Sequence, residues 1–293
     1  MTVGGVTMNH KIPAVFSYIA SKRNDLTLRE NEIANFVIEN PSFIVNNTIT
    51  NIASKIGVSE TSINRFCKKI GYKGFQDFKI ALVQENFYRE IQIVQKDVSQ
   101  SSVISMLNDY KKILDNTSSM IKEENLIEST ACIKNSNDIY VFDNHSTLKV
   151  AACLKQKLKL IDIDVIVIND WASMKLYTAK CKKDDVFITF LNTMCSSSMM
   201  DCLSLVKQNK GKNIVITSYD SMKMNELSTI KFVTADKFCV ENKDSLNEEI
   251  TFIFIIDLLF NYLLKDERLA QEKQNSDSII EIDQISNSYY FNM

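Results

Sequence analysis

The feature that most constrains the fold is residues 48–79, which read TITNIASKIGVSETSINRFCKKIGYKGFQDFK. Apolar residues recur at helical spacing from Ile49 to Ile56 and stop at Gly57, a residue type that tolerates the left-handed backbone of a sharp turn. Ser59 follows, and its side-chain oxygen can cap a second helix. Two short amphipathic helices joined by a tight turn predict a helix-turn-helix.

The second helix of this stretch has two different faces. An apolar face runs from Ile63 to Ile70, and the opposite face carries hydroxyls, an amide and cations. Those groups can read base edges and hold phosphates, whereas a basic face alone is common on any solvated helix. The turn, the cap and the polar face together favour DNA binding, and the expected contact residues are Ser59, Thr61, Ser62, Asn64, Arg65, Lys68, Lys69 and Lys73.

A further helix is expected upstream of this stretch. Thr27 and Glu30 have the spacing of a capping box, in which each side chain satisfies a backbone N–H at the helix start. Pro41 disfavours helix at Asn40, so that helix should end there.

Charge is divided unevenly along the chain. Residues 1–80 hold ten Lys/Arg and six Asp/Glu, a net charge of +4, and the remainder must carry −6 to give the overall −2. This asymmetry is weak evidence, but it agrees with a nucleic-acid-facing first part.

The sequence gives little sign of metal, cofactor or membrane chemistry. There are seven Cys without a C-x-x-C pair and two His, which favours reduced thiols and no metal or cofactor site. The longest apolar stretch, residues 250–264, is interrupted by Asp257 and Asn261 and is shorter than a membrane span of about 20 residues. Without a secretory signal pattern at the start, we expect a cytoplasmic protein.

The second half of the chain alternates helical segments with short β-rich runs. These runs are residues 138–142, 164–168, 186–191, 213–217 and 230–233. Such alternation predicts a five-stranded parallel sheet flanked by helices. A last helix, residues 247–264, is apolar nearly all round and should be buried in a core or at a subunit contact.

The residues from Gly57 to Lys79 resemble the signature of the RpiR (MurR/RpiR) family of bacterial transcription regulators, most specifically in the run NRFCKKIGYKGF. In that family an N-terminal helix-turn-helix precedes a sugar isomerase (SIS) domain. The resemblance implies an all-α DNA-binding domain at 1–88, a helical linker at 89–105, an α/β sensor or dimerisation domain at 106–268, and a tail at 269–293.

In SIS domains the loops after the strands bind phosphosugars through glycines and hydroxyls. The residues of the corresponding loops that we expect to contact the ligand are Asn144, His145, Thr147, Thr193, Ser196, Ser197 and Ser218. The chain departs from the family pattern, because Asp143 and His145 replace glycines of the first loop and Met194 replaces the glycine of the second. Since glycine lets backbone approach a phosphate, these changes bear on which ligand the loops accept.

The resemblance implies a regulator of carbohydrate metabolism that binds a near-palindromic operator as a homodimer or homotetramer and responds to a phosphosugar-like effector. We expect no catalytic residues. One alternative is a sugar-phosphate aldose–ketose isomerase with His145 as general base. Another is a regulator whose degenerate SIS domain serves only for dimerisation.

Overall fold

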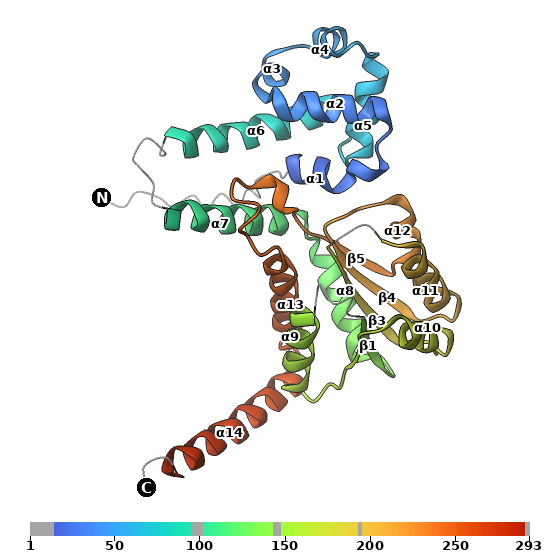
Figure 1. The fold of residues 1–293 in the computed structure, drawn as a ribbon, viewed down its shortest axis with the longest axis vertical. Coiled ribbons are helices and arrows are strands. Elements are labelled where there is room, and N and C mark those ends of the chain that lie inside the picture. Colours follow the sequence, from blue (N-terminus) through green and yellow to red (C-terminus); the bar gives the residue numbers. More distant parts are fainter. Residues whose placement is uncertain (1–14, 95–101, 143–147, 193–194, 291–293) are drawn as a thin grey trace. The chain divides into compact units, whose positions relative to one another are not determined.

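The computed structural model describes residues 15–94, 102–142, 148–192 and 195–290, which form two compact units (Figure 1). The first unit is Met1–Met120 with Ala235–Leu246, and the second is Ile121–Thr234 with Asn247–Met293. The first is helical and the second is α/β, so the fold class expected from the sequence is confirmed. The segment Ala235–Leu246 is grouped with the helical unit although its neighbours in sequence belong to the other.

The first unit is built from short helices around one apolar core. Its α-helices are α1 Val15–Lys22, α2 Leu28–Glu39, α3 Pro41–Asn46, α4 Ile49–Ile56, α5 Glu60–Lys69, α6 Phe75–Val94 and α7 Ser102–Met120, and its 3₁₀ turns are η1 Arg23–Asp25 and η2 Lys237–Cys239. The core includes Ile19, Ile52, Phe66 and Phe78, all nearly inaccessible to solvent. The rings of Phe66 and Phe78 meet edge to face at 6.2 Å.

Local sequence signals set the ends of α2 and α3 as predicted. Thr27 Oγ1 accepts the Glu30 N–H and the Glu30 carboxylate accepts the Thr27 N–H, which completes the capping box. α2 ends at its C-cap Asn40, and Pro41 opens α3 at a position where a helix needs no N–H. The first helix begins on a buried carboxylate, because Glu85 of α6 accepts the Val15 N–H at 2.7 Å.

The second unit is organised on a parallel five-stranded sheet with the order β2-β1-β3-β4-β5. The strands are β1 Ile139–Phe142, β2 Ile166–Ile168, β3 Val186–Leu191, β4 Lys212–Thr217 and β5 Ile230–Val233. Every predicted β-rich run therefore contains a strand. The central strand β3 is buried along its whole length.

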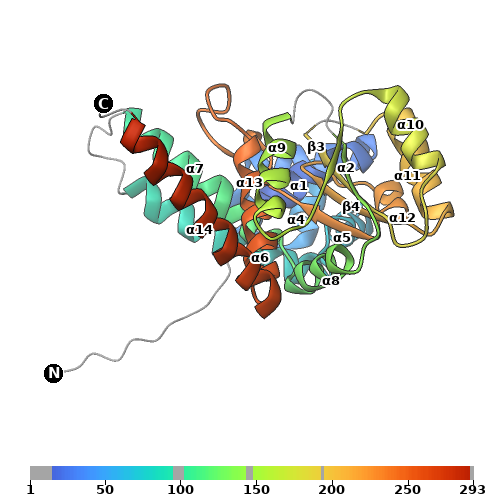
Figure 2. The ribbon, with the colours of Figure 1, turned by 90° about the horizontal axis from the view of Figure 1, so that it is seen from below.

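Helices cover both faces of the sheet (Figures 1 and 2). They are α8 Glu123–Lys134, α9 Leu148–Lys159, α10 Trp171–Ala179, α11 Ser197–Gln208, α12 Met222–Leu227 and α13 Glu249–Leu263. The last helix, α14 Glu267–Tyr290, follows α13. Side chains alternate along β3, so that Val186, Ile188 and Phe190 pack with α8, α9 and α13. Phe187 and Leu191 pack on the opposite face with α10, α11 and α12.

The chain reverses its direction across the sheet between β1 and β3. After β1 it enters α9 on one face, whereas after the neighbouring β3 it enters α11 on the other. This is the topological switch point of a doubly wound sheet, where ligands bind outside the carboxyl ends of the strands. The connections that leave β1 and β3 are the first and second loops expected to bind ligand.

The C-terminal helices differ in burial. α13 packs against α8 and α9 and buries Phe252, Ile256 and Leu259, as expected for a helix apolar nearly all round. α14 occupies the region for which the sequence predicted only a polar tail. Its Leu269 is buried, while Ile279 and Ile280 are exposed.

Candidate nucleic-acid interface and ligand site

The turn between α4 and α5 has the geometry that its residues predict. Gly57 adopts a left-handed conformation, with φ 79° and ψ 35°, and caps α4 through its N–H to Ala53 O at 2.9 Å. An added Cβ at Gly57 would meet no atom within 4 Å, so backbone conformation rather than space favours glycine. Ser59 Oγ then accepts the Ser62 N–H at 3.1 Å and caps α5.

α5 presents to solvent the side chains expected from its helical pattern. Ile63, Phe66 and Cys67 are buried in the core. Burial raises the pKa of the Cys67 thiol to about 12, so it is an inert apolar group rather than a nucleophile. On the opposite side Thr61, Arg65 and Lys68 are exposed.

Four of the predicted DNA contacts have side-chain partners within the protein. Ser62 Oγ is 2.8 Å from Ser59 Oγ. Asn64 is half-buried and its Oδ1 accepts the Phe75 N–H at 3.0 Å, which joins α5 to the start of α6. Lys69 Nζ is 2.8 Å from Glu30 Oε2, which joins α5 to the capping box of α2. These contacts orient α5 on its own domain.

Side chains also fix the first turn of α5 and the segment that follows this helix. Thr50 of α4 donates to Glu60 Oε1 at 2.6 Å, so the carboxylate in the first turn of α5 is fixed. Lys73 is exposed, while its backbone N–H donates to Asp77 at 3.0 Å. Lys79, which the sequence suggested as a further phosphate contact, donates from Nζ to Asn47 O at 2.7 Å.

Among the predicted ligand residues, Ser196, Ser197 and Ser218 follow the carboxyl ends of β3 and β4, and the others fall outside the described residues. These others are Asn144, His145, Thr147 and Thr193. Ser196 is the N-cap of α11 and accepts the Met199 N–H at 3.2 Å, and Ser197 is exposed in the first turn. A helix start of this kind offers backbone N–H groups to an anion.

Ser218 follows β4 and differs from the other predicted ligand residues. It is buried, and its Oγ has no hydrogen-bond partner among the described residues. The same holds for Thr234, which follows β5 and which the sequence analysis did not name. The two are neighbours, because the Thr234 N–H donates to Thr217 O at 2.9 Å. The alternation of β5 could have indicated Thr234, since Ile230 and Phe232 precede it on one face.

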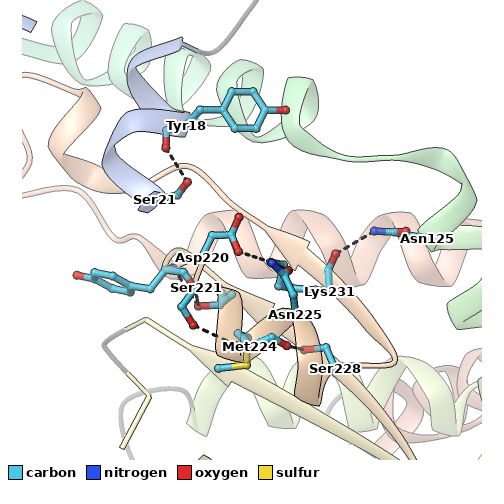
Figure 3. A network of polar contacts seen from close by, with 11 residues as sticks. Tyr18, Ser21, Asn125, Asp220, Ser221, Met224, Asn225, Ser228 and Lys231 are labelled. Carbon is cyan, nitrogen blue, oxygen red and sulfur yellow. Dashed lines mark hydrogen bonds and ion pairs between the residues drawn. The ribbon is translucent and has the colours of Figure 1, made fainter. Parts of the chain in front are cut away.

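The loop after β4 is fixed by a small polar network (Figure 3). Lys231 of β5 forms an ion pair with Asp220 and also contacts Asn225 Oδ1. The Lys231 carbonyl accepts from Asn125 Nδ2 at 2.9 Å, so the network extends to α8. Ser221 accepts the Met224 N–H at 3.1 Å and caps α12. This network positions the third expected loop, residues 218–221.

The described ionisable groups of the second unit include no activated cysteine nucleophile. Burial raises the pKa of Cys195, beside the second loop, to about 11, with Lys223 acting in the opposite direction. The cysteines are all free thiols. Within the described ranges no cluster of His, Cys, Asp and Glu could hold a metal ion, and no helix is long and apolar enough to cross a membrane.

Residues 14–87 match the family model for the rpiR-family helix-turn-helix domain. The N-terminal part of the chain therefore carries a helix-turn-helix domain of the rpiR type. Helices α1 to α6, with their caps and the left-handed Gly57, thus correspond to a DNA-binding domain of that family. The resemblance inferred from residues 57–79 is confirmed.

Two curated relatives cover nearly the whole chain. An uncharacterized HTH-type transcriptional regulator of Haemophilus influenzae is 25% identical over 276 residues, 91% of this chain and 96% of the relative. Another, from Caldanaerobacter subterraneus, is 22% identical over 93% of this chain and 99% of the relative.

Two solved structures share the fold. The NanR protein of Vibrio vulnificus, complexed with ManNAc-6P, superposes with a TM-score of 0.54 at 18% identity, over 91% of this chain and 98% of that one. The sugar isomerase domain of an RpiR transcription factor from Sphaerobacter thermophilus gives a TM-score of 0.53 at 15% identity, over 64% of this chain and 99% of that one. The α/β unit therefore has the SIS-like fold expected from the sequence.

Proposed function

We propose that this RpiR-family regulator binds a near-palindromic operator through α5 and responds to a phosphosugar-like effector at the carboxyl edge of its sheet. The observation that carries the first part is the exposed face of α5, where Thr61, Arg65 and Lys68 are presented on a capped helix with a buried opposite side. A protein of this kind acts on DNA in the bacterial cytoplasm.

The contacts within the protein divide the predicted DNA-binding residues into three roles. Thr61 and Arg65 read base edges, because they are exposed near the N-terminal part of α5, the end that enters the major groove in this motif. Lys68 and Lys73 hold phosphates. The helix is positioned by the hydrogen bonds and the ion pair of Ser59, Ser62, Asn64 and Lys69. These four side chains contact DNA through the hydrogen-bond donors that are not used within the protein.

The effector proposal rests on hydrogen-bonding capacity at the sheet edge. Ser196 and Ser197 open α11, where backbone N–H groups favour a phosphate. The Ser218 and Thr234 hydroxyls are buried and have no hydrogen-bond partner among the described residues, and a polar ligand is one physical reason to keep such groups. Asn144, His145, Thr147 and Thr193 remain proposed contacts. The ligand of NanR, ManNAc-6P, is the first compound to test.

We propose a regulator rather than an enzyme, and a homodimer or homotetramer as its assembly. Two copies of α5 placed about one helical turn of DNA apart would match a two-fold operator. Among the described residues of the sheet edge, Cys195 is no activated nucleophile, because burial raises its pKa.

The test is to compare Arg65→Ala with Arg29→Ala on an operator fragment selected with the wild-type chain. Arg29 is an exposed arginine on α2 that pairs with Glu32. Loss of a base-reading arginine should weaken binding by about 1–3 kcal/mol and relax base preference at one position of each half-site. Fluorescence anisotropy and footprinting measure both effects, and equal affinities for the two variants would contradict the assignment.

A further inference from the structure

Ala235–Leu246, hereafter the strap, connects the end of β5 to the start of α13 and yet packs within the helical unit. Its covalent ends join residues of the α/β unit, Thr234 directly after β5 on one side and Asn247 just before α13 on the other. Its noncovalent contacts, in contrast, are made with α7 and α1. The strap therefore belongs to one unit by packing and to the other by sequence.

Two side chains of α7 hold the backbone of the strap. Thr117 Oγ1 accepts the Ala235 N–H at 3.1 Å, in a buried hydrogen bond. Asp109 accepts the Asn242 N–H at 2.9 Å, the Asn242 side-chain amide at 2.7 Å and the Glu241 N–H at 3.3 Å. Both ends of the strap are thus fixed to one helix.

Asp109 is the stronger of the two attachments. Its residue is 5% exposed, and burial by itself would raise the carboxyl pKa. The N–H groups of Asn242 and Glu241 reverse that effect and lower the pKa, so the carboxylate stays ionised and accepts charge-assisted hydrogen bonds. An ionised carboxylate that stayed buried without these donors would destabilise the folded state. We therefore expect the hydrogen bonds from the strap to Asp109 to form and break together.

The middle of the strap reaches the DNA-binding core. η2 packs against α1, and burial raises the pKa of the Cys239 thiol while the nearby Asn116 and Ser17 side chains act in the opposite direction. α1 contributes Phe16 and Ile19 to the core that also contains Phe66 of α5. A displacement of the strap would therefore act on α1, which shares its core with the recognition helix.

We propose that the strap is a built-in coupling device with Asp109 as its latch: it transmits movement of the end of β5 and the start of α13 to α1 and thereby to α5. The coupling is covalent at the sheet edge and electrostatic at α7. This inference rests on the proposed function, since it assumes that α5 binds DNA.

The first experiment measures hydrogen exchange of the strap in the full-length protein. Asp109→Asn is compared with Asp115→Asn, which removes the same charge from an exposed position on the same helix. Loss of the carboxylate should speed exchange of strap amides by about tenfold, whereas the Asp115 variant should match wild type. Equal strap exchange in the two variants would rule out the latch. Asn242→Ala changes the partner in the strap and provides the same test if Asp109→Asn does not fold.

The second experiment asks whether the strap responds to DNA. Adding the selected operator fragment to wild type should slow exchange in the strap, because coupling between two sites is reciprocal. In Asp109→Asn that change should be lost, and operator binding should weaken by about threefold to tenfold although the substitution is not on α5.

The outcomes separate the two proposals. If wild type binds no DNA fragment, the proposed function fails. If wild type binds DNA but its strap exchange is unchanged, and the Asp109 and Asp115 variants bind equally, the strap is an ordinary structural loop and the coupling proposal fails.

Discussion

The α4–α5 turn and the carboxyl edge of the sheet share a serine helix cap, but they differ in how many of their polar side chains have partners within the protein. In both places a serine caps the helix that follows, Ser59 for α5 and Ser196 for α11. Around α5 the polar side chains that face the protein are bonded to it, as Asn64 and Lys69 show. At the sheet edge, buried hydroxyls such as that of Ser218 have no partner in the described part of the chain.

This difference suggests two kinds of site. A surface that binds a large, rigid partner benefits from side chains that are already oriented, because less ordering is needed on binding. A site for a small effector needs hydrogen-bonding groups that the ligand can complete. Side chains of the proposed DNA-reading helix are thus already held by contacts within the protein. At the proposed effector edge, in contrast, buried hydroxyls of the described residues lack hydrogen-bond partners.

The largest expected effect tests whether the two regions fold on separate cores. Phe66→Ala removes a fully buried ring from the helical unit, and Phe190→Ala removes one that packs against Phe252 in the α/β unit. Each should lower the free energy of unfolding of its own unit by about 3–5 kcal/mol. Urea unfolding followed by hydrogen exchange should show one unit shifted in each variant, and a shift of both units in both variants would contradict separate cores.

The next effect compares the two serine caps directly. Ser59→Ala and Ser196→Ala each remove one acceptor from a helix start and should each cost about 1 kcal/mol of stability. Ser59→Ala should also weaken operator binding but leave ManNAc-6P binding unchanged, and Ser196→Ala should do the reverse. Calorimetry and anisotropy on both variants check this, with the exposed Ser54→Ala as control. Identical binding profiles for the two cap variants would remove the distinction between the sites.

A smaller effect concerns the ion pair behind α5. Burial would raise the Glu30 pKa, but Lys69 and Thr27 lower it below the ordinary value of 4.5. A lowered folded-state pKa gives stability that is present above pH 4.5 and is lost as the pH falls through the folded pKa. Glu30→Gln should therefore be less stable than wild type at neutral pH, by up to ~1 kcal/mol, and should approach it in acid. The exposed Glu32→Gln should show a smaller difference, and a gap that widened in acid would contradict the sign.

The smallest effect on stability is expected for Ser218→Ala. The Ser218 hydroxyl is buried and has no hydrogen-bond partner in the part of the chain that the structure describes, so its removal should leave the free energy of unfolding unchanged or slightly raised. Binding of ManNAc-6P should nevertheless fall. A matched Thr217→Val change should lower stability, because Thr217 Oγ1 accepts the Tyr219 N–H at 3.0 Å. A clear loss of stability in Ser218→Ala would mean that this hydroxyl already has a structural role.

The sequence determined those features that depend on residues close together in the chain. The capping box of Thr27, the turn at Gly57 and the cap at Ser59 each need partners within a few residues, and all were predicted. The strands were predicted for a similar reason, since short apolar runs between helices are a local pattern. The exposed face of α5 followed from helical periodicity alone.

Only the tertiary structure decided where distant partners meet. No local sequence pattern predicted how the strap packs, because its Asn242 binds Asp109, which is 133 positions away in the sequence. The sequence predicted Lys69 as a DNA contact, and it did not indicate that Lys69 binds Glu30, which is 39 residues away. The order β2-β1-β3-β4-β5, which puts the switch point between β1 and β3, likewise depends on crossings between faces that local propensity does not encode.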